Sequence, residues 1–135
     1  MITNHLVNVS LLGDLKKLES LNLSYTRVVD VSTLAQLTNL KDLDLSNTNV
    51  VDVSALAQLI NLKSLRLSAT RLLDVSTLPE LKNLKILDLS FTNVVYVSAL
   101  AKLTNLKSLN LRETKVVDVT TLKNKMPKLE VRLCW

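Results

Sequence analysis

This 135-residue chain has a single cysteine and a single histidine, the residue types that most often serve as nucleophile and base or as metal ligands. A cysteine nucleophile needs a base within hydrogen-bond reach, and the sole cysteine, Cys134, and the sole histidine, His5, lie at opposite ends of the chain. One cysteine also excludes an intrachain disulfide and a cysteine metal cluster. A single glycine, Gly13, leaves no glycine-rich loop for phosphate groups. The sequence therefore predicts no catalytic residue, no metal ligand and no cofactor site.

A 22-residue repeat positions the remaining polar side chains. It recurs five times from Leu18 to Met126, and each copy runs through LxxLxL, SxT, two aliphatic residues and DVSxLAxL or a close variant. LxxLxL predicts a short strand with three leucines on its inner side, and the wider aliphatic spacing that follows predicts a short helical or 3₁₀ segment. A unit this short cannot enclose its own core and must stack on its copies.

These motifs resemble the leucine-rich repeat family, specifically the 22-residue subclass of internalin-like proteins and protein-phosphatase-1 regulators. The resemblance implies an α/β leucine-rich repeat solenoid, with a curved parallel sheet on the concave face and short helical or 3₁₀ turns on the convex face. One column departs from the family, which usually has Asn three residues after the last strand leucine. The chain has threonine in that column: Thr26, Thr48, Thr70, Thr92 and Thr114. A hydroxyl has one donor where an amide has two, so this column is expected to satisfy fewer buried carbonyls.

Two polar columns near the helical segments predict turn and cap hydrogen bonds. An aspartate two residues before the segment suits an Asx turn, and a serine directly before it suits a helix N-cap. The aspartates are Asp30, Asp52, Asp74 and Asp118, and the serines are Ser32, Ser54, Ser76 and Ser98. Neither column needs a catalytic explanation.

The repeats predict a single domain over residues 1–135. Residues 1–17 are a partial N-terminal repeat, residues 18–127 hold the five repeats, and residues 128–135 form a terminal strand. The sequence starts in mid-repeat, so its first full strand is expected to have little cover. This predicts self-association through the uncapped N-terminal end, or an upstream segment.

The outward positions of the strands and turns vary while the frame stays constant, so a partner-binding surface is expected there. Aromatic and arginine side chains on a rigid sheet are the usual anchors of a protein interface. The predicted partner-binding residues are Tyr25, Arg27, Asp44, Asn47, Arg66, Arg71, Asp88 and Phe91. Two alternatives stay open: Asp44, Arg66 and Asp88 neutralise one another across adjacent strands, and the rings of Tyr25 and Phe91 only shield loop edges.

A lysine column and a formal net charge of +5 raise the question of nucleic-acid binding. The column consists of Lys41, Lys63, Lys85 and Lys107. No stacking aromatic residues are interleaved with it and no nucleic-acid module is recognisable, which argues against nucleic acid as a partner. Solvated lysines at strand edges also discourage precipitation, and this explains the column.

The sequence thus favours a protein-protein interaction module that binds a protein of unknown identity on the concave sheet face. The alternative is a structural spacer, or a truncated or engineered repeat array without its own ligand. An enzyme is not expected, because Asp44 and Asp88 would lie about 10 Å apart with no apolar pocket to raise either pKa. Polar residues interrupt every apolar run, so no membrane span is predicted. Cysteine usage favours a cytoplasmic protein, with a fragment of a secreted or surface protein as the alternative.

Overall fold

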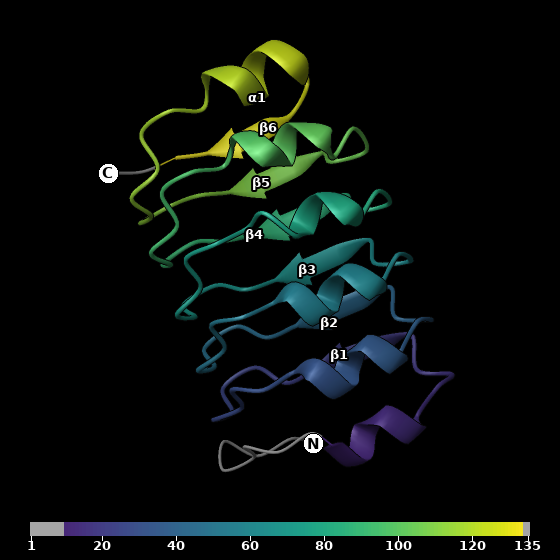
Figure 1. The fold of residues 1–135 in the computed structure, drawn as a ribbon. Coiled ribbons are helices and arrows are strands. Elements are labelled where there is room, and N and C mark those ends of the chain that lie inside the picture. The colour runs from purple at the N-terminus through teal and green to yellow at the C-terminus, as the bar shows by residue number, and fades with distance from the viewer. Residues whose placement is uncertain (1–9, 134–135) are drawn as a thin grey trace.

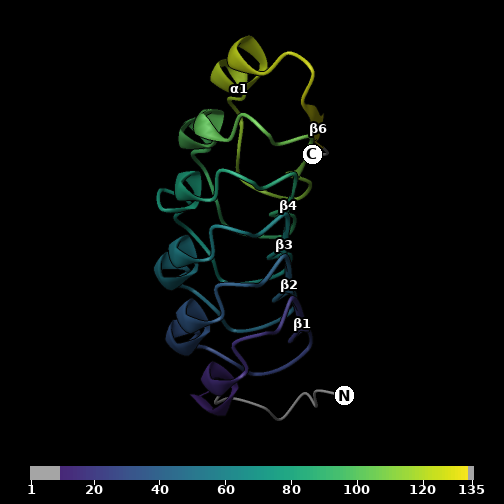
Figure 2. The same ribbon diagram turned by 90° about the vertical axis from the view of Figure 1, so that its right-hand side faces the viewer.

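The computed structural model describes residues 10–133, and residues 1–9 and 134–135, which include His5 and Cys134, lie outside the described part. The described chain is a stack of coils, one per repeat (Figure 1). Figure 2 shows the strands on one side of the stack and the helical turns on the other. In chain order the elements are η1 (Ser10–Asp14), β1 (Ser20–Asn22), η2 (Ser32–Gln36), β2 (Asp42–Asp44), η3 (Ser54–Gln58), β3 (Ser64–Arg66), η4 (Leu78–Glu80), β4 (Ile86–Asp88), η5 (Ser98–Lys102), β5 (Ser108–Asn110), α1 (Thr120–Lys125) and β6 (Glu130–Arg132).

The strands form one parallel six-stranded sheet in sequence order, β1 to β6. Each strand pairs with the next in the register of the repeat, so that Leu21 lies opposite Leu43 and Leu43 opposite Leu65. The helical turns η1 to η5 are 3₁₀ helices and α1 is a short α-helix. This confirms the predicted parallel sheet backed by short helical or 3₁₀ turns.

The core lies between the sheet and the helical turns and consists almost entirely of leucine and valine. In the second repeat, the strand leucines Leu40, Leu43 and Leu45 are at most 2% exposed, and Leu56 of η3 is fully buried. These side chains belong to a single buried cluster that continues through all the repeats. Each coil therefore buries its apolar side chains against its neighbours.

A column of asparagines, which the sequence analysis did not single out, links the repeats. Asn61 donates its side-chain amide to the carbonyl oxygen of Thr38 in the preceding repeat at 2.8 Å. The same bond at the same distance recurs for the equivalent residues Asn39, Asn83 and Asn105. These amides satisfy carbonyl groups of the loops that precede the strands, and they tie each coil to the one before it.

The threonine column acts inside each repeat and not between repeats. The Thr48 hydroxyl donates to the Leu45 carbonyl oxygen at 2.7 Å, and the equivalent threonines make the same bond at 2.6 to 2.8 Å. Within residues 10–133 no buried side-chain nitrogen or oxygen lacks a partner. The threonine column therefore bonds within each turn, whereas the asparagine column supplies side-chain bonds between repeats.

The aspartate column forms the predicted Asx turns, but the predicted serine caps are wrong. Asp52 Oδ1 accepts a hydrogen bond from the Ser54 amide at 2.8 Å, and Asp30, Asp74 and Asp118 accept the equivalent bond. The N-cap residues of η2, η3 and η5 are valines, and no side-chain cap bond is present at these helices or at η4. Ser32, Ser54 and Ser98 are the first residues of these helices and not their N-caps, and the Ser76 hydroxyl donates to Asp74 Oδ2 at 3.1 Å.

Replacing Thr48 by valine should destabilise the protein by about 1 to 3 kcal/mol, because the buried Leu45 carbonyl loses its hydroxyl donor while the shape of the side chain is kept. Thr104 is exposed, so Thr104→Val is the matched control and should leave stability nearly unchanged. Urea unfolding measures both. Equal stability of Thr48→Val and the wild type would show that the hydroxyl is dispensable.

Acid should weaken the Asx turns. Hydrogen bonds from the backbone amides of Ser32, Ser54 and Thr120, with a further contribution from their side chains, lower the pKa of Asp30, Asp52 and Asp118 below the ordinary 3.8. Ionised aspartates therefore stabilise the folded state above that pH, and this contribution is lost as the pH falls through the lowered pKa values.

The triple variant Asp30→Asn, Asp52→Asn, Asp118→Asn tests this expectation. An asparagine oxygen accepts the same backbone bond, as Asn22 does from Ser24 at 2.9 Å, but it does not titrate. Unfolding free energies measured from pH 7 to about pH 2.5 should fall less steeply in the variant than in the wild type. Parallel pH profiles would contradict the proposed source of acid sensitivity.

Candidate functional site

The outward side of the strands, which we call the sheet face, carries the central row of predicted site residues. The strand register places Asp44 opposite Arg66, and Arg66 opposite Asp88. The central leucines of β2, β3 and β4, Leu43, Leu65 and Leu87, point inward and are buried, so the residues that follow them lie on the outward side. Three of the eight predicted residues therefore form one continuous row across β2, β3 and β4.

The two carboxylates in this row accept hydrogen bonds from the turns that follow their own strands, and within the described residues they form no ion pair with Arg66. Asp44 Oδ1 accepts the Ser46 amide at 2.9 Å. Asp88 Oδ1 accepts both the amide and the hydroxyl of Ser90, at 3.0 and 2.6 Å. Within residues 10–133 no ion pair joins Arg66 to either carboxylate, since the pairs found there are Lys41–Glu19 and Arg132–Glu130. The exposed Arg66 guanidinium thus remains available to a partner.

The turn that follows each strand has a left-handed residue, and this residue is Tyr25, Asn47 and Phe91 in the first, second and fourth repeats. The φ angles of these three residues are 59°, 57° and 56°. Each backbone amide donates to a carbonyl oxygen of the next repeat, as from Phe91 to Arg112 at 2.9 Å. Asparagine tolerates this conformation, whereas a large L-residue is strained in it.

The rings in these turns are largely solvated. Tyr25 is 67% exposed and Phe91 is 62% exposed. They lie three repeats apart, about 14 Å by strand spacing, so they do not form one aromatic cluster. Neither the conformation nor the burial of the ring accounts for an aromatic residue at these positions.

Arg27 and Arg71 lie outside the row on the sheet face. Each follows its turn and begins the segment that returns toward the 3₁₀ helix, and the Arg71 amide donates to the Val50 carbonyl oxygen of the neighbouring return segment at 3.1 Å. Both side chains are exposed. The structure therefore separates these two arginines from Asp44, Arg66 and Asp88.

The sheet face also carries an apolar residue that the sequence analysis missed. Ile86 is 41% exposed and begins β4, the strand that contains Asp88 and leads to Phe91. The signal was present in the sequence, because the equivalent residues Ser20, Asp42, Ser64, Ser108 and Glu130 are all polar. We call Arg66, Ile86, Asp88 and Phe91 the β4 patch.

The sheet face offers little to metal or acid-base chemistry. Within the described part of the chain, no group of three or more His, Cys, Asp or Glu residues could hold a metal ion. Asp44 and Asp88 are two strands apart with Arg66 between them, as expected from the repeat. No helix of residues 10–133 is long and apolar enough to cross a membrane.

Comparisons with known proteins agree with this architecture. The family model of leucine-rich repeats in two copies matches residues 38–80 and 82–124. An internalin C2 (inlC2) of Listeria monocytogenes is 32% identical, with a TM-score of 0.87, over 96% of this chain and 57% of that one. An internalin (inlF) of the same bacterium is 28% identical, with a TM-score of 0.89, over 94% of this chain and 37% of that one. No curated protein sequence matches.

A third solved structure, of a TLR13–ssRNA13 complex, is 25% identical with a TM-score of 0.81 and covers 98% of this chain and 20% of that chain. The chain thus spans 37% to 57% of the length of the two internalins. The segments that match the family model make up more than half of the chain, and they contain β2 to β5 of the stacked sheet. The chain therefore belongs to the leucine-rich repeat family and is internalin-like.

Proposed function

We propose that this chain binds a protein partner on the sheet face, with the β4 patch at the centre of the interface. Leucine-rich repeat proteins commonly mediate protein-protein interaction. The observation that carries the proposal is the exposure of Ile86 and Phe91 beside Arg66, which has no ion pair within residues 10–133. Aromatic and arginine side chains next to apolar area are enriched among the residues that dominate binding energy.

The dimensions of the sheet face fit a modest interface. Six strands at about 4.8 Å spacing give a width of about 24 Å, which accommodates a helix, a strand or the edge of a small domain. Tyr25 and Asn47 extend the surface toward the first repeats, at the edge where the strands end. Arg27 and Arg71 lie past the turns and would contact only a partner that wraps around that edge.

Backbone strain at the left-handed positions of the turns supports a functional reason for the aromatic rings of Tyr25 and Phe91. A left-handed L-residue other than asparagine or aspartate costs about 1 kcal/mol or more. Phe91 bears this cost although it is 62% exposed and so gains little from packing. A residue that lowers stability and does not fill the core is expected to be retained when it contributes to binding.

Protein is favoured over nucleic acid as the partner. The TLR13 structure is a complex with single-stranded RNA, but the lysine column of this chain has no interleaved rings on which bases could stack. Lys63 and Lys85 precede the strands, and their backbones are joined at 2.8 Å by an inter-repeat bond, so they form an edge of the sheet face. We propose no catalytic role, and the spacer without a ligand stays the competing hypothesis.

The compartment is part of the proposal. We keep the expectation of a cytoplasmic protein, which rests on the single cysteine. Cell fractionation followed by detection with an antibody against the repeats separates it from the alternative, a segment of a secreted or surface protein. Sedimentation at several concentrations tests the expected self-association.

The variant Arg66→Glu, Ile86→Ala, Phe91→Ala tests the sheet face. A partner is first identified by unbiased pull-down and mass spectrometry, and its affinity is then measured. We expect the variant to lose about 2 kcal/mol or more of binding free energy, about thirtyfold in Kd, because it removes the anchors of the interface.

The matched control is Lys102→Glu, Ile60→Ala, Tyr96→Ala, which makes the same kinds of change at exposed positions off the sheet face. It should bind like the wild type. Unchanged affinity of a correctly folded β4-patch variant would refute binding on this face and favour the spacer.

Phe91→Asn should raise the free energy of unfolding by about 1 kcal/mol, because asparagine relieves the left-handed strain, and should weaken partner binding. Tyr96→Asn is the control, since Tyr96 is 84% exposed and has no positive φ. Denaturant unfolding and the binding assay give the two readouts. A gain in stability with full binding would show that the ring is not an anchor.

A further inference from the structure

An exposed aliphatic stripe runs along the return segments, which connect the turns after the strands to the 3₁₀ helices. In each aliphatic pair of the repeat the first residue is fully buried and the second is exposed. The exposed residues are Val29 (52%), Val51 (45%), Leu73 (60%), Val95 (37%) and Val117 (81%), which we call the aliphatic stripe. Neighbouring return segments are bonded to each other, as from the Asn49 amide to the Val28 carbonyl oxygen at 3.0 Å, so the column is continuous.

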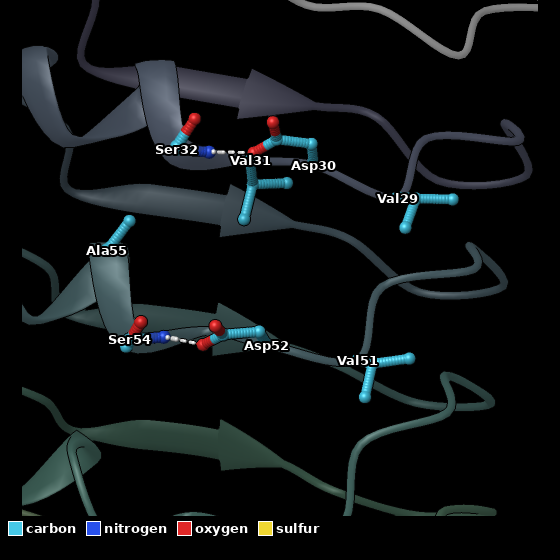
Figure 3. Close-up of a pocket in the computed structure, with 8 residues that line it drawn as sticks. All are labelled: Val29, Asp30, Val31, Ser32, Val51, Asp52, Ser54 and Ala55. Carbon is cyan, nitrogen blue, oxygen red and sulfur yellow. Dashed lines mark hydrogen bonds between the residues drawn. The ribbon is translucent and has the colours of Figure 1, made fainter.

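A row of carboxylates accompanies the stripe. Each aspartate of the Asx turns directly follows a stripe residue and is exposed. Figure 3 shows Val29 above Val51 and Asp30 above Asp52, with the aspartates between the helical turns and the valines. These four residues line a shallow groove of about 290 Å³ together with Val31, Ser32, Ser54 and Ala55. The chain as a whole has a net charge of +5, so this negative row is a local feature.

We propose that the aliphatic stripe and the aspartate row form a second docking surface, whose occupant is a basic amphipathic α-helix of a partner protein. Aliphatic side chains of the helix would lie on the stripe, and lysine or arginine side chains along one flank would pair with the aspartates. This surface lies on the return segments and not on the strands, so the proposal does not depend on the function proposed for the sheet face.

The spacing of the stripe favours a helix over an extended peptide. Adjacent repeats are about 4.8 Å apart at the strands, and the spacing is somewhat larger at the bulkier helical turns. An α-helix presents about one apolar residue per turn of 5.4 Å on a given line, which matches this spacing. Side chains on one side of an extended strand recur at about 6.7 Å and lose register after two repeats.

The negative charge of the aspartate row favours a positively charged partner. Each aspartate uses Oδ1 for its own turn, and within residues 10–133 no ion pair joins any of these aspartates to a cationic side chain. The same stripe on a second copy would bring aspartates against aspartates, so a self-complementary dimer through this surface is disfavoured. A cationic helix gains from the whole row.

A synthetic peptide of 18 residues serves as the probe in the experiment. It has one leucine per helical turn on one side and lysines along one flank of the leucines, and alanine and glutamine fill the other positions. Two control peptides have the same composition with the sequence scrambled, or a proline pair that breaks the helix. Fluorescence anisotropy with the full chain measures the affinity, and circular dichroism measures the helicity gained on binding.

We expect the probe to bind in helical form at least about tenfold more tightly than either control peptide, with an affinity that falls as salt is added. The variant Asp30→Asn, Asp52→Asn, Asp118→Asn keeps the turn bonds and should weaken binding about tenfold or more. Val51→Ser with Leu73→Ser, both at exposed positions, should have a similar effect. The β4-patch variant should bind the probe like the wild type.

Four results would overturn the proposal. The first is a scrambled peptide that binds like the probe, and the second is full affinity in both stripe variants. The third is equal binding of the proline peptide, which would indicate an extended occupant. Self-association that is lost in the Val51→Ser, Leu73→Ser variant would assign the stripe to a second copy instead and would also overturn it.

Discussion

Each coil of this protein can bury its leucines only against the coils before and after it. The rest of the structure depends on this constraint, because the strands must then stay in the register of the repeat, with Leu21, Leu43 and Leu65 opposite one another. A slip by one residue would turn a buried leucine outward in every strand. Positions that face outward are free of the constraint. They can change from repeat to repeat without disturbing the stack, and a binding surface can therefore arise there.

The stack also requires that every turn satisfy its polar backbone groups in the same way. In the second repeat three side chains supply these bonds, those of Thr48, Asp52 and Asn61. A threonine bonds within the turn after the strand, an aspartate bonds before the 3₁₀ helix, and an asparagine bonds across to the preceding repeat. The left-handed residue at positions such as Asn47 and Phe91 closes the turn. The conformation is therefore architectural, since all five repeats have it, and only the choice of a ring over asparagine calls for another explanation.

The sequence predicted the parts of the structure that depend on spacing. LxxLxL indicated the strands and their order, and the aspartate column indicated the Asx turns. Local spacing does not reveal at which residue a 3₁₀ helix begins, so the serine caps were wrong. The role of Asn61 was missed because its acceptor belongs to another repeat. Ile86 was missed although the sequence carried a signal, since the other residues of its column are polar. The left-handed φ of Phe91 is a property of the turn and not of the residue type.

The two proposed surfaces differ in how they relate to the repeat, and this difference limits what each can recognise. The β4 patch consists of positions that do not repeat, since Ile86 is apolar in a polar column and the columns of Arg66 and Phe91 vary from repeat to repeat. Such a surface occurs once and fixes a partner in one place. The aliphatic stripe consists of positions that keep the pattern, so a helix could bind it in several registers one repeat apart. Tyr96 interrupts the aspartate row in the fourth repeat. That interruption removes one charge from the row and so makes the registers unequal, which would favour the one that places a neutral residue of the helix against Tyr96.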